Sequence, residues 1–212
     1  MKTLVCVPCM DMLHTEFCRS LLAMERIGDV EIMFCISSLI YDARNVLSSA
    51  AIDGNFDRVL WLDSDMSFES DLMRRLSEHL DQGKEIVCGL YFGRKQPVRP
   101  VIYKALYLSR ENGSPKANAK NYDDYPRDDI FSVAGCGFGA VMMTTAALRR
   151  VYAACSLPFF PVAGFGEDLA FCRRATELGL QIWCDSSIRL GHIGAAVFDE
   201  DLYLAGKEQG NE

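Results

Sequence analysis

Two carboxylates one residue apart follow an apolar run in this 212-residue chain. The run is Arg-Val-Leu-Trp-Leu at 58–62, and the carboxylates are Asp63 and Asp65. A buried strand of an α/β sheet is typically a continuous apolar run, and ligands of such sheets bind beyond the carboxyl ends of the strands. Two carboxylates there could hold Mg²⁺ or Mn²⁺, hard cations that prefer oxygen ligands. A solvated turn would explain Asp63 and Asp65 equally well, because Asp and Ser favour turns.

Acidic and imidazole side chains recur in the second half of the chain. Glu167 and Asp168 open a predicted helix over 167–178, where the helix dipole favours negative charge. Capping of that helix would by itself explain the pair. His192 stands between two glycines after the last predicted strand, 181–184. A lone histidine is more often structural or solvated than catalytic, so each of these features is weak by itself.

Three alternate glycines, Gly135, Gly137 and Gly139, interrupt an apolar segment over 131–143. Glycine in a strand can mark a bulge. It can also let a ligand approach the backbone closely.

Basic and amide side chains offer candidate phosphate contacts. Arg44 and Asn45 lie in a predicted helix over 41–53, where they could be ordinary polar positions. Arg94 and Lys95 belong to a basic loop over 92–100. Arg44, Arg94 and Lys95 could bind phosphate oxygens through charge-assisted hydrogen bonds.

Strands and helices that could position these side chains alternate over residues 1–91. This alternation predicts a parallel, Rossmann-like sheet with right-handed crossovers. Strands are expected at 3–7 (ended by Pro8), 30–36, 58–62 and 86–91, and helices at 14–26, 41–53 and 70–82.

The regular alternation ends after residue 91. A strand is expected at 101–108, and Thr144 or Thr145 should cap a short helix that ends near residue 152. Residues 109–129 are polar and lack an apolar period, which predicts a mobile flap over a site. Residues 196–212 are expected to form a polar, loosely held tail.

Composition narrows the class of protein. The net charge of −7 argues against non-specific nucleic-acid binding, so no nucleic-acid partner is expected. The cysteine count of nine is odd, and several cysteines lie in apolar runs, which indicates a reducing compartment. No apolar run reaches membrane-span length, and a strand begins almost at once with no signal-peptide layout. We therefore expect a cytoplasmic protein of one domain.

The motifs, taken together and in this order, resemble the metal-dependent, GT-A-type glycosyltransferases, in particular the family-2-like group. The resemblance covers roughly residues 3–195 and implies a single-domain α/β fold with a Rossmann-like sheet flanked by helices. That sheet would be mostly parallel with a mixed C-terminal half. Residues 1–91 would form the nucleotide-binding half and residues 92–195 the acceptor and catalytic half. The motifs are Pro8, Arg44-Asn45, Asp63-Ser64-Asp65, Gly135 to Gly139, Glu167-Asp168 and His192.

The resemblance also implies a chemistry. The donor would be a nucleotide sugar, with a UDP-sugar favoured, and the acceptor would be an unknown carbohydrate or another hydroxyl compound. A divalent metal, Mn²⁺ or Mg²⁺, would sit on Asp65 and His192 with help from Asp63 and would neutralise the diphosphate. Asp168 would be the general base and Glu167 would orient the acceptor. The implied outcome is inversion at the anomeric carbon, although retaining enzymes share the fold. Donor contacts would come from Pro8, Arg44, Asn45, Asp63, Arg94 and Gly137.

Two other functions fit parts of the same pattern. A nucleotidyltransferase also uses acidic metal ligands, but it usually carries a glycine-rich basic loop after its first strand. Here that place holds Cys9-Met10-Asp11-Met12. The second alternative is a non-catalytic nucleotide- or sugar-binding module of the same fold.

Overall fold

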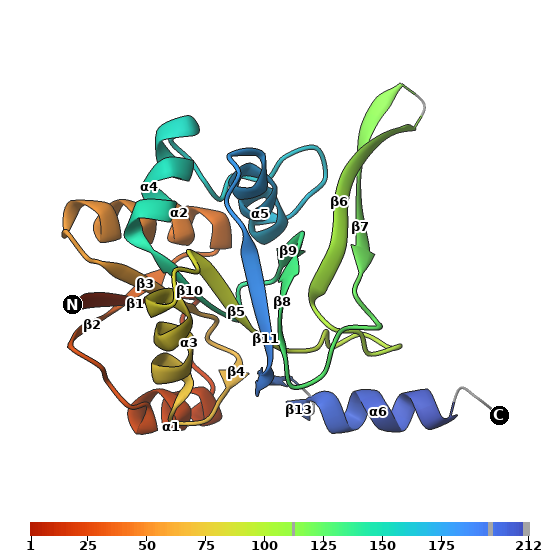
Figure 1. Ribbon diagram of the computed structural model, residues 1–212, viewed down its shortest axis with the longest axis horizontal. Coiled ribbons are helices and arrows are strands. Elements are labelled where there is room, and N and C mark those ends of the chain that lie inside the picture. Colours follow the sequence, from red (N-terminus) through yellow and green to blue (C-terminus); the bar gives the residue numbers. More distant parts are fainter. Residues whose placement is uncertain (112, 195–196, 210–212) are drawn as a thin grey trace.

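A seven-stranded sheet forms the centre of the computed structural model, which describes residues 1–111, 113–194 and 197–209 (Figure 1). The strand order is β2-β1-β3-β10-β5-β11-β8. The strands are β1 (Lys2–Cys9), β2 (Asp29–Ile36), β3 (Arg58–Leu62), β5 (Ile86–Leu90), β8 (Ile130–Val133), β10 (Ala140–Thr144) and β11 (Ile182–Arg189).

The directions of the strands make the sheet mixed. β2, β1 and β3 are parallel to one another, and β5 is parallel to β11. β10 runs antiparallel between β3 and β5, and β8 runs antiparallel to β11 at the edge. The predicted α/β fold, mostly parallel with a mixed C-terminal half, is confirmed. The strand predicted after β3 is β5. In the sheet, however, β10 from the second half of the chain lies between β3 and β5.

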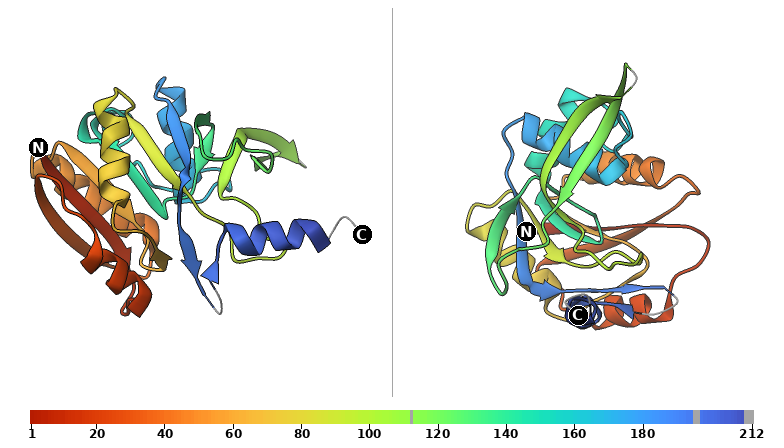
Figure 2. Two further views of the ribbon diagram at one scale, coloured as in Figure 1. Left: turned by 60° about the horizontal axis from the view of Figure 1, so that its bottom comes forward. Right: turned by 90° about the vertical axis from the view of Figure 1, so that its right-hand side faces the viewer.

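Helices cover both faces of this sheet (Figures 1 and 2). Successive side chains of a strand point to opposite faces, so Val59 and Trp61 of β3 enter one core while Leu60 and Leu62 enter the other. Burying each such side chain contributes roughly 1.5–3 kcal/mol. The first core lies under α2 (Ile40–Asp53), α4 (Thr145–Ala154) and α5 (Glu167–Glu177), and the second under α1 (Thr15–Ala23) and α3 (Leu72–Asp81).

Local signals set the ends of several helices. Thr144 caps α4 as expected, since its Oγ1 accepts a hydrogen bond from the Ala147 amide at 3.1 Å. Gly83 follows α3 with a φ of 90°, a left-handed conformation that glycine adopts without steric cost. The first strand does not stop at Pro8 but continues to Cys9. β3 pairs with β1 only as far as Cys6, so the missing N–H of Pro8 removes no bond on that side.

Residues 109–129 do not form the predicted flap. Most of them belong to a hairpin of β6 (Ile102–Glu111) and β7 (Ser114–Asn121), which projects from the body of the molecule (Figure 1). β6 also pairs with the short β9 (Gly135–Cys136). Cross-strand pairing satisfies the backbone here while the side chains stay largely exposed. A polar segment can therefore be a strand without an apolar period.

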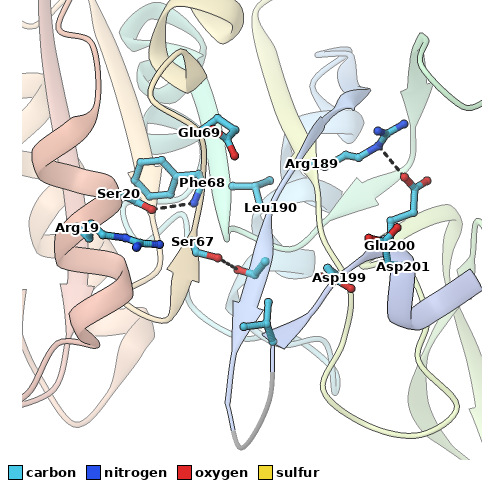
Figure 3. A pocket seen from close by; sticks show the side chains of 12 residues that line it. Arg19, Ser20, Ser67, Phe68, Glu69, Arg189, Leu190, Asp199, Glu200 and Asp201 are labelled. Carbon is cyan, nitrogen blue, oxygen red and sulfur yellow. Dashed lines mark hydrogen bonds and ion pairs between the residues drawn. The ribbon is translucent and has the colours of Figure 1, made fainter. Parts of the chain in front are cut away.

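The last part of the chain also differs from the expected loose tail. Residues Glu200–Gln209 form α6, and Tyr203 is buried. Glu200 is buried as well, and its carboxylate lies 2.6 Å from Nε of Arg189 at the end of β11 (Figure 3). Ahead of α6, β12 (Gly191–Ile193) pairs with β4 (Met66–Ser67) and β13 (Val197–Phe198). None of the helices in the described ranges combines the length and apolar character that crossing a membrane requires.

Candidate active site

The predicted site residues gather at one edge of the sheet. Asp63 follows β3 and Tyr91 follows β5, and these two strands run in the same direction. Because β10 is antiparallel to both, its beginning lies at this edge too, and the Asp63 amide donates to the Gly139 carbonyl at 3.1 Å. This is the carboxyl end of the parallel strands, where ligands of α/β sheets bind.

Arg44 connects the two acidic motifs. Its guanidinium is 1 % exposed, and Nη2 donates to Oδ1 of Asp63 at 2.7 Å. Nε lies 3.6 Å from Oε1 of Glu167, the first residue of α5. Two carboxylates more than a hundred residues apart in the sequence thus face one cation.

Aromatic rings enclose the guanidinium of Arg44. It lies 5.2 Å from the ring centroid of Phe138, and 5.8 Å from the centroids of both Trp61 and Phe159. Cations over aromatic faces are attracted by the ring quadrupole. Burial lowers the pKa of Arg44, but the charges of Asp63 and Glu167 outweigh it and leave the pKa above its ordinary value. Arg44 is therefore a fixed positive charge under the site.

Asp168 lies beside the same cluster, at the start of α5. Burial, with the nearby charge of Glu167, raises the pKa of Asp168 to about 6. Its Oδ1 accepts a hydrogen bond from the Leu169 amide at 2.6 Å. A carboxylate with a pKa close to neutral suits a general base, which must accept a proton and release it again. Burial likewise raises the pKa of Asp63, although Arg44 opposes that shift.

The pairing of β4 with β12 brings Asp65 and His192 together. Asp65 immediately precedes β4, His192 lies opposite Met66, and the Ile193 amide donates to the Asp65 carbonyl at 2.7 Å. Nε2 of His192 lies 3.3 Å from Oδ2 of Asp65. Nδ1 of His192 is 2.8 Å from the Phe92 carbonyl. If Nδ1 donates to that carbonyl, Nε2 faces Asp65, to which it donates a hydrogen bond when the imidazole is protonated, and it offers a lone pair when the imidazole is neutral.

Arg94 completes the surroundings of Asp65. Its Nη1 lies 3.1 Å from Oδ2 of Asp65 and donates to the Ile193 carbonyl at 2.9 Å. Burial alone would raise the pKa of Asp65, but the hydrogen bond from His192 and the charges of His192 and Arg94 hold the pKa below its ordinary value. Asp65 is therefore a carboxylate at neutral pH.

Asp65 and His192 are residue types that bind divalent cations. Metal-bound histidines usually donate their other ring nitrogen to a carbonyl or carboxylate, and the Phe92 carbonyl is placed for this. The set is incomplete, since no group of three or more His, Cys, Asp or Glu side chains in the described ranges is arranged to hold a metal. Asp65 and His192 would supply one oxygen and one nitrogen ligand, so a bound cation would need further oxygen ligands from solvent or substrate.

The glycine motif makes room for Tyr91. A Cβ at Gly137 would lie 1.8 Å from the Tyr91 hydroxyl, and one at Gly139 would lie 2.9 Å from the Tyr91 ring. The Tyr91 ring packs edge-on against His192, with centroids 5.4 Å apart. Burial, followed by the charges of Asp63 and Asp168, raises the pKa of Tyr91 well above its ordinary value. The glycines were expected to let a ligand approach the backbone closely. At Gly137 the Tyr91 side chain occupies that space instead.

Asn45 and Pro8 have structural contacts at the same edge. Oδ1 of Asn45 accepts a hydrogen bond from the Phe159 amide at 3.0 Å, which ties the aromatic loop to α2. Nδ2 of Asn45 has no partner in the described chain. Pro8 is buried near the end of β1. Neither residue is seen to contact Asp63 or Asp65 within the part of the chain that the structure describes, and the hydrogen bond from the Phe159 amide gives Asn45 a structural role.

Sequence reasoning missed Tyr91 and Tyr103. Burial, with the charge of Asp168, raises the pKa of Tyr103 to about 12, so this residue of β6 also lies near the candidate base. Tyr91 could have been found, because it is the last residue of the predicted strand 86–91, which was expected to run parallel to the strand before Asp63. Tyr103 could not, since its place depends on the pairing of β6 with β9.

Comparison with solved structures shows the fold. The chain resembles the crystal structure of A197 from STIV, with a TM-score of 0.68 and 18% identity over 95% of this chain and 91% of that one. It also resembles GalNAc-T7 crystallised with UDP, GalNAc and Mn²⁺, with a TM-score of 0.60 and 8% identity over 98% of this chain and 47% of that one. The chain has a GT-A-like fold.

A third likeness agrees with this fold. S. aureus TarS, residues 1–349, gives a TM-score of 0.53 at 15% identity, over 88% of this chain and 61% of that one. The chain thus spans less than two thirds of the GalNAc-T7 and TarS structures. No protein-family model matches the sequence, and no curated protein matches it. These likenesses support the GT-A-like fold. A function has to be inferred from the geometry of the site residues described above.

Proposed function

We propose that this protein is a glycosyltransferase that moves a sugar from a nucleotide-sugar donor to an acceptor hydroxyl. One observation carries the proposal: buried Arg44 joins Asp63 to Glu167 and so places the Asp-x-Asp motif beside the Glu-Asp motif. A packing role alone does not require a buried cation between two acidic motifs. Removing one partner of a buried ion pair strongly destabilises the folded state.

On the donor side, Arg94 would bind the nucleotide diphosphate directly and Asp65 would bind it through a metal ion, while Asp63 would lie closer to the ribose or assist the metal through water. Arg94 is half-exposed, so its guanidinium can turn from Asp65 to a phosphate oxygen. UDP is the favoured nucleotide, since the GalNAc-T7 structure with this fold holds UDP and Mn²⁺. Gly137 would act indirectly, by leaving room for the Tyr91 hydroxyl beside the donor.

Asp65 and His192 would hold a divalent cation, Mn²⁺ or Mg²⁺, whose positive charge would stabilise the departing diphosphate. Within the protein, the Phe92 carbonyl would orient His192 for this purpose. Arg44 would favour the ionised form of Asp63, because its charge opposes the rise in pKa that burial causes.

Asp168 would act on the acceptor. As the acceptor oxygen forms its bond to the anomeric carbon, the Asp168 carboxylate takes the hydroxyl proton. The bond between the anomeric carbon and the phosphate oxygen breaks, and the nucleoside diphosphate leaves with the electron pair. Glu167 would orient the acceptor. Attack from the side opposite the leaving group would invert the configuration.

Nucleotide release tests the proposal. The protein is incubated with Mn²⁺ and a panel of nucleotide sugars, and free nucleoside diphosphate is measured. We expect UDP from at least one UDP-sugar, and much less of it from Asp168→Asn. Turnover of a nucleoside triphosphate and a sugar phosphate to pyrophosphate would instead identify a nucleotidyltransferase. Binding of UDP with no turnover of any donor would identify a non-catalytic module.

A further inference from the structure

A hollow of ≈ 450 Å³ lies beside His192, between the loop 93–101 and the base of the β6–β7 hairpin. Arg94, Lys95 and Arg99 line it together with Tyr103 and Asn121 of the hairpin. The chain as a whole carries a net charge of −7. Three cations around one hollow therefore contrast with the average surface and favour an anionic occupant.

The three cations differ in what they already bind. Nη1 of Arg94 is used by Asp65 and the Ile193 carbonyl. Arg99 makes an exposed ion pair with Asp123 at 3.4 Å, and exposed pairs of this kind are weak. Within the described chain, Lys95 has no carboxylate partner. Lys95 and Arg99 are thus free to bind a ligand at small cost.

The hollow lies on the side of the candidate base. Tyr103 lines it and pairs with Gly135 of β9, where an added Cβ would lie 3.3 Å from the side chain of Leu169, the neighbour of Asp168. His192 also lines the hollow, and its Nε2 lies 3.3 Å from Oδ2 of Asp65, one of the residues assigned to the donor side. A molecule with a hydroxyl at Asp168 would pass Tyr103, and the rest of it would reach Lys95 and Arg99.

We infer that this hollow binds a phosphate group on the acceptor, so that the acceptor is a phosphate-bearing hydroxyl compound. The inference rests on the proposed function and names its acceptor class. A phosphate matches these cations better than a carboxylate does, because a carboxylate neutralises one positive charge where Lys95 and Arg99 offer two. Asn121 and the Tyr103 hydroxyl add neutral hydrogen-bonding groups beside it.

The test uses the full chain saturated with UDP and Mn²⁺, so that the donor diphosphate site is filled. Glycerol 3-phosphate is then titrated, with glycerol and with sodium chloride of equal ionic strength as matched controls. Thermal unfolding and calorimetry report binding. Of these three additions, we expect only glycerol 3-phosphate to stabilise the UDP-bound protein. Lys95→Gln combined with Arg99→Gln should weaken this binding at least about tenfold through lost charge-assisted hydrogen bonds, and UDP binding should stay unchanged.

Three results would overturn the inference. The first is loss of the response to glycerol 3-phosphate when UDP is saturating, and the second is loss of UDP binding in the double variant. Either result would assign the hollow to the donor diphosphate. Equal responses to glycerol and glycerol 3-phosphate would remove the anion site. Failure of the proposed function has a different signature, because the wild-type protein would then bind no UDP or turn over no donor while the response to phosphate persists.

Discussion

Arg44 is the residue on which the site depends most directly. It is buried under three aromatic rings, and it faces carboxylates from the end of β3 and the start of α5. Nη1 of Arg44 also lacks a hydrogen-bond partner in the described chain. Buried polar groups are nearly always paired. A substrate oxygen or an ordered water near Asp63 and Glu167 would satisfy this one.

Removal of Arg44 should destabilise the fold. Arg44→Gln leaves Asp63 and Glu167 close together without their shared cation. We expect the free energy of unfolding to fall by about 3 kcal/mol, near the lower end for a broken buried pair, because water still reaches Asp63. Urea denaturation measures this. The control is Arg19→Gln, at an exposed arginine of α1. Equal stability of the two variants would show that Arg44 is not the central cation.

The raised pKa of Asp168 predicts a pH dependence of catalysis. A base must be deprotonated to accept a proton, so transfer should fall as the pH drops through about 6. In Asp168→Asn this acidic limb should disappear together with roughly 10²- to 10⁴-fold of the rate. Measuring kcat between pH 5 and 8 tests both points. A retained limb in the variant would assign the titration to another group.

The stability of the same variant supplies the control. A carboxylate whose pKa is raised in the folded state favours folding most when protonated, so its stabilising contribution is lost as the pH rises from about 4 to about 6. Above pH 6, Asp168→Asn should therefore be at least as stable as the wild type in thermal unfolding. Lower stability there would mean that lost rate reflects damage to the fold.

Helix α6 is the element with an unexpected link to the site. Its Tyr203 packs on Phe92 with ring centroids 4.8 Å apart, and the Phe92 carbonyl holds Nδ1 of His192. Glu200 anchors the start of the helix to Arg189 and to the Tyr125 hydroxyl. The helix thus supports the backbone that orients the candidate metal ligand.

Loss of this support should weaken the metal-dependent part of nucleotide binding. In Tyr203→Ala the Phe92 ring loses its neighbour, so we expect a smaller gain in melting temperature when Mn²⁺ is added to the UDP-bound protein. Tyr203→Phe keeps the ring and should retain most of that gain. The control is Leu202→Ala, at an exposed position of the same helix. Equal Mn²⁺ responses in all three variants would mean that α6 does not act on His192.

Local patterns predicted the elements well but not their partners. The sequence predicted the alternating strands and helices, Thr144 as a cap, and glycines after α3 and α5. These features could be predicted because they depend on neighbours in the sequence. The insertion of β10 between β3 and β5 was not, since strand pairing over such separations leaves no local signal. The strand predicted at 101–108 matches most of β6, but β7 was missed because its exposed side chains carry no apolar period.

The candidate site shows the same division. Asp63, Asp65, Glu167, Asp168 and His192 could be chosen by residue type and place at element ends. Their salt-bridge partners could not, because Arg94 reaches Asp65 only through the course of the loop 92–100. Gly137 was chosen for a ligand, while only the fold reveals the Tyr91 side chain above it.

At the scale of the whole molecule, ligand binding should couple to stability. A ligand at 100 times its dissociation constant adds about 2.7 kcal/mol to the free energy of unfolding. We expect UDP and Mn²⁺ together to stabilise the fold more than the sum of their separate effects. In Asp65→Asn that excess should vanish, and UDP alone should bind at least as well because Arg94 is released.

Thermal unfolding with each ligand alone and with both measures this coupling. The control is Asp201→Asn, at an exposed carboxylate of α6 beside a different hollow of ≈ 360 Å³ (Figure 3). It should keep the full excess. Persistence of the excess in Asp65→Asn would remove Asp65 from the metal site.

The place of β10 in the sheet has a consequence for how the chain folds. β3 and β5 belong to the half that resembles a nucleotide-binding unit, yet each completes its hydrogen bonds on β10, which is made much later along the chain. Residues 1–91 as a fragment would leave β5 without a partner strand and both cores open on that side. The pairing of β3 and β5 can therefore be completed only after residues 140–144 are made, and we predict that residues 1–91 do not fold stably by themselves.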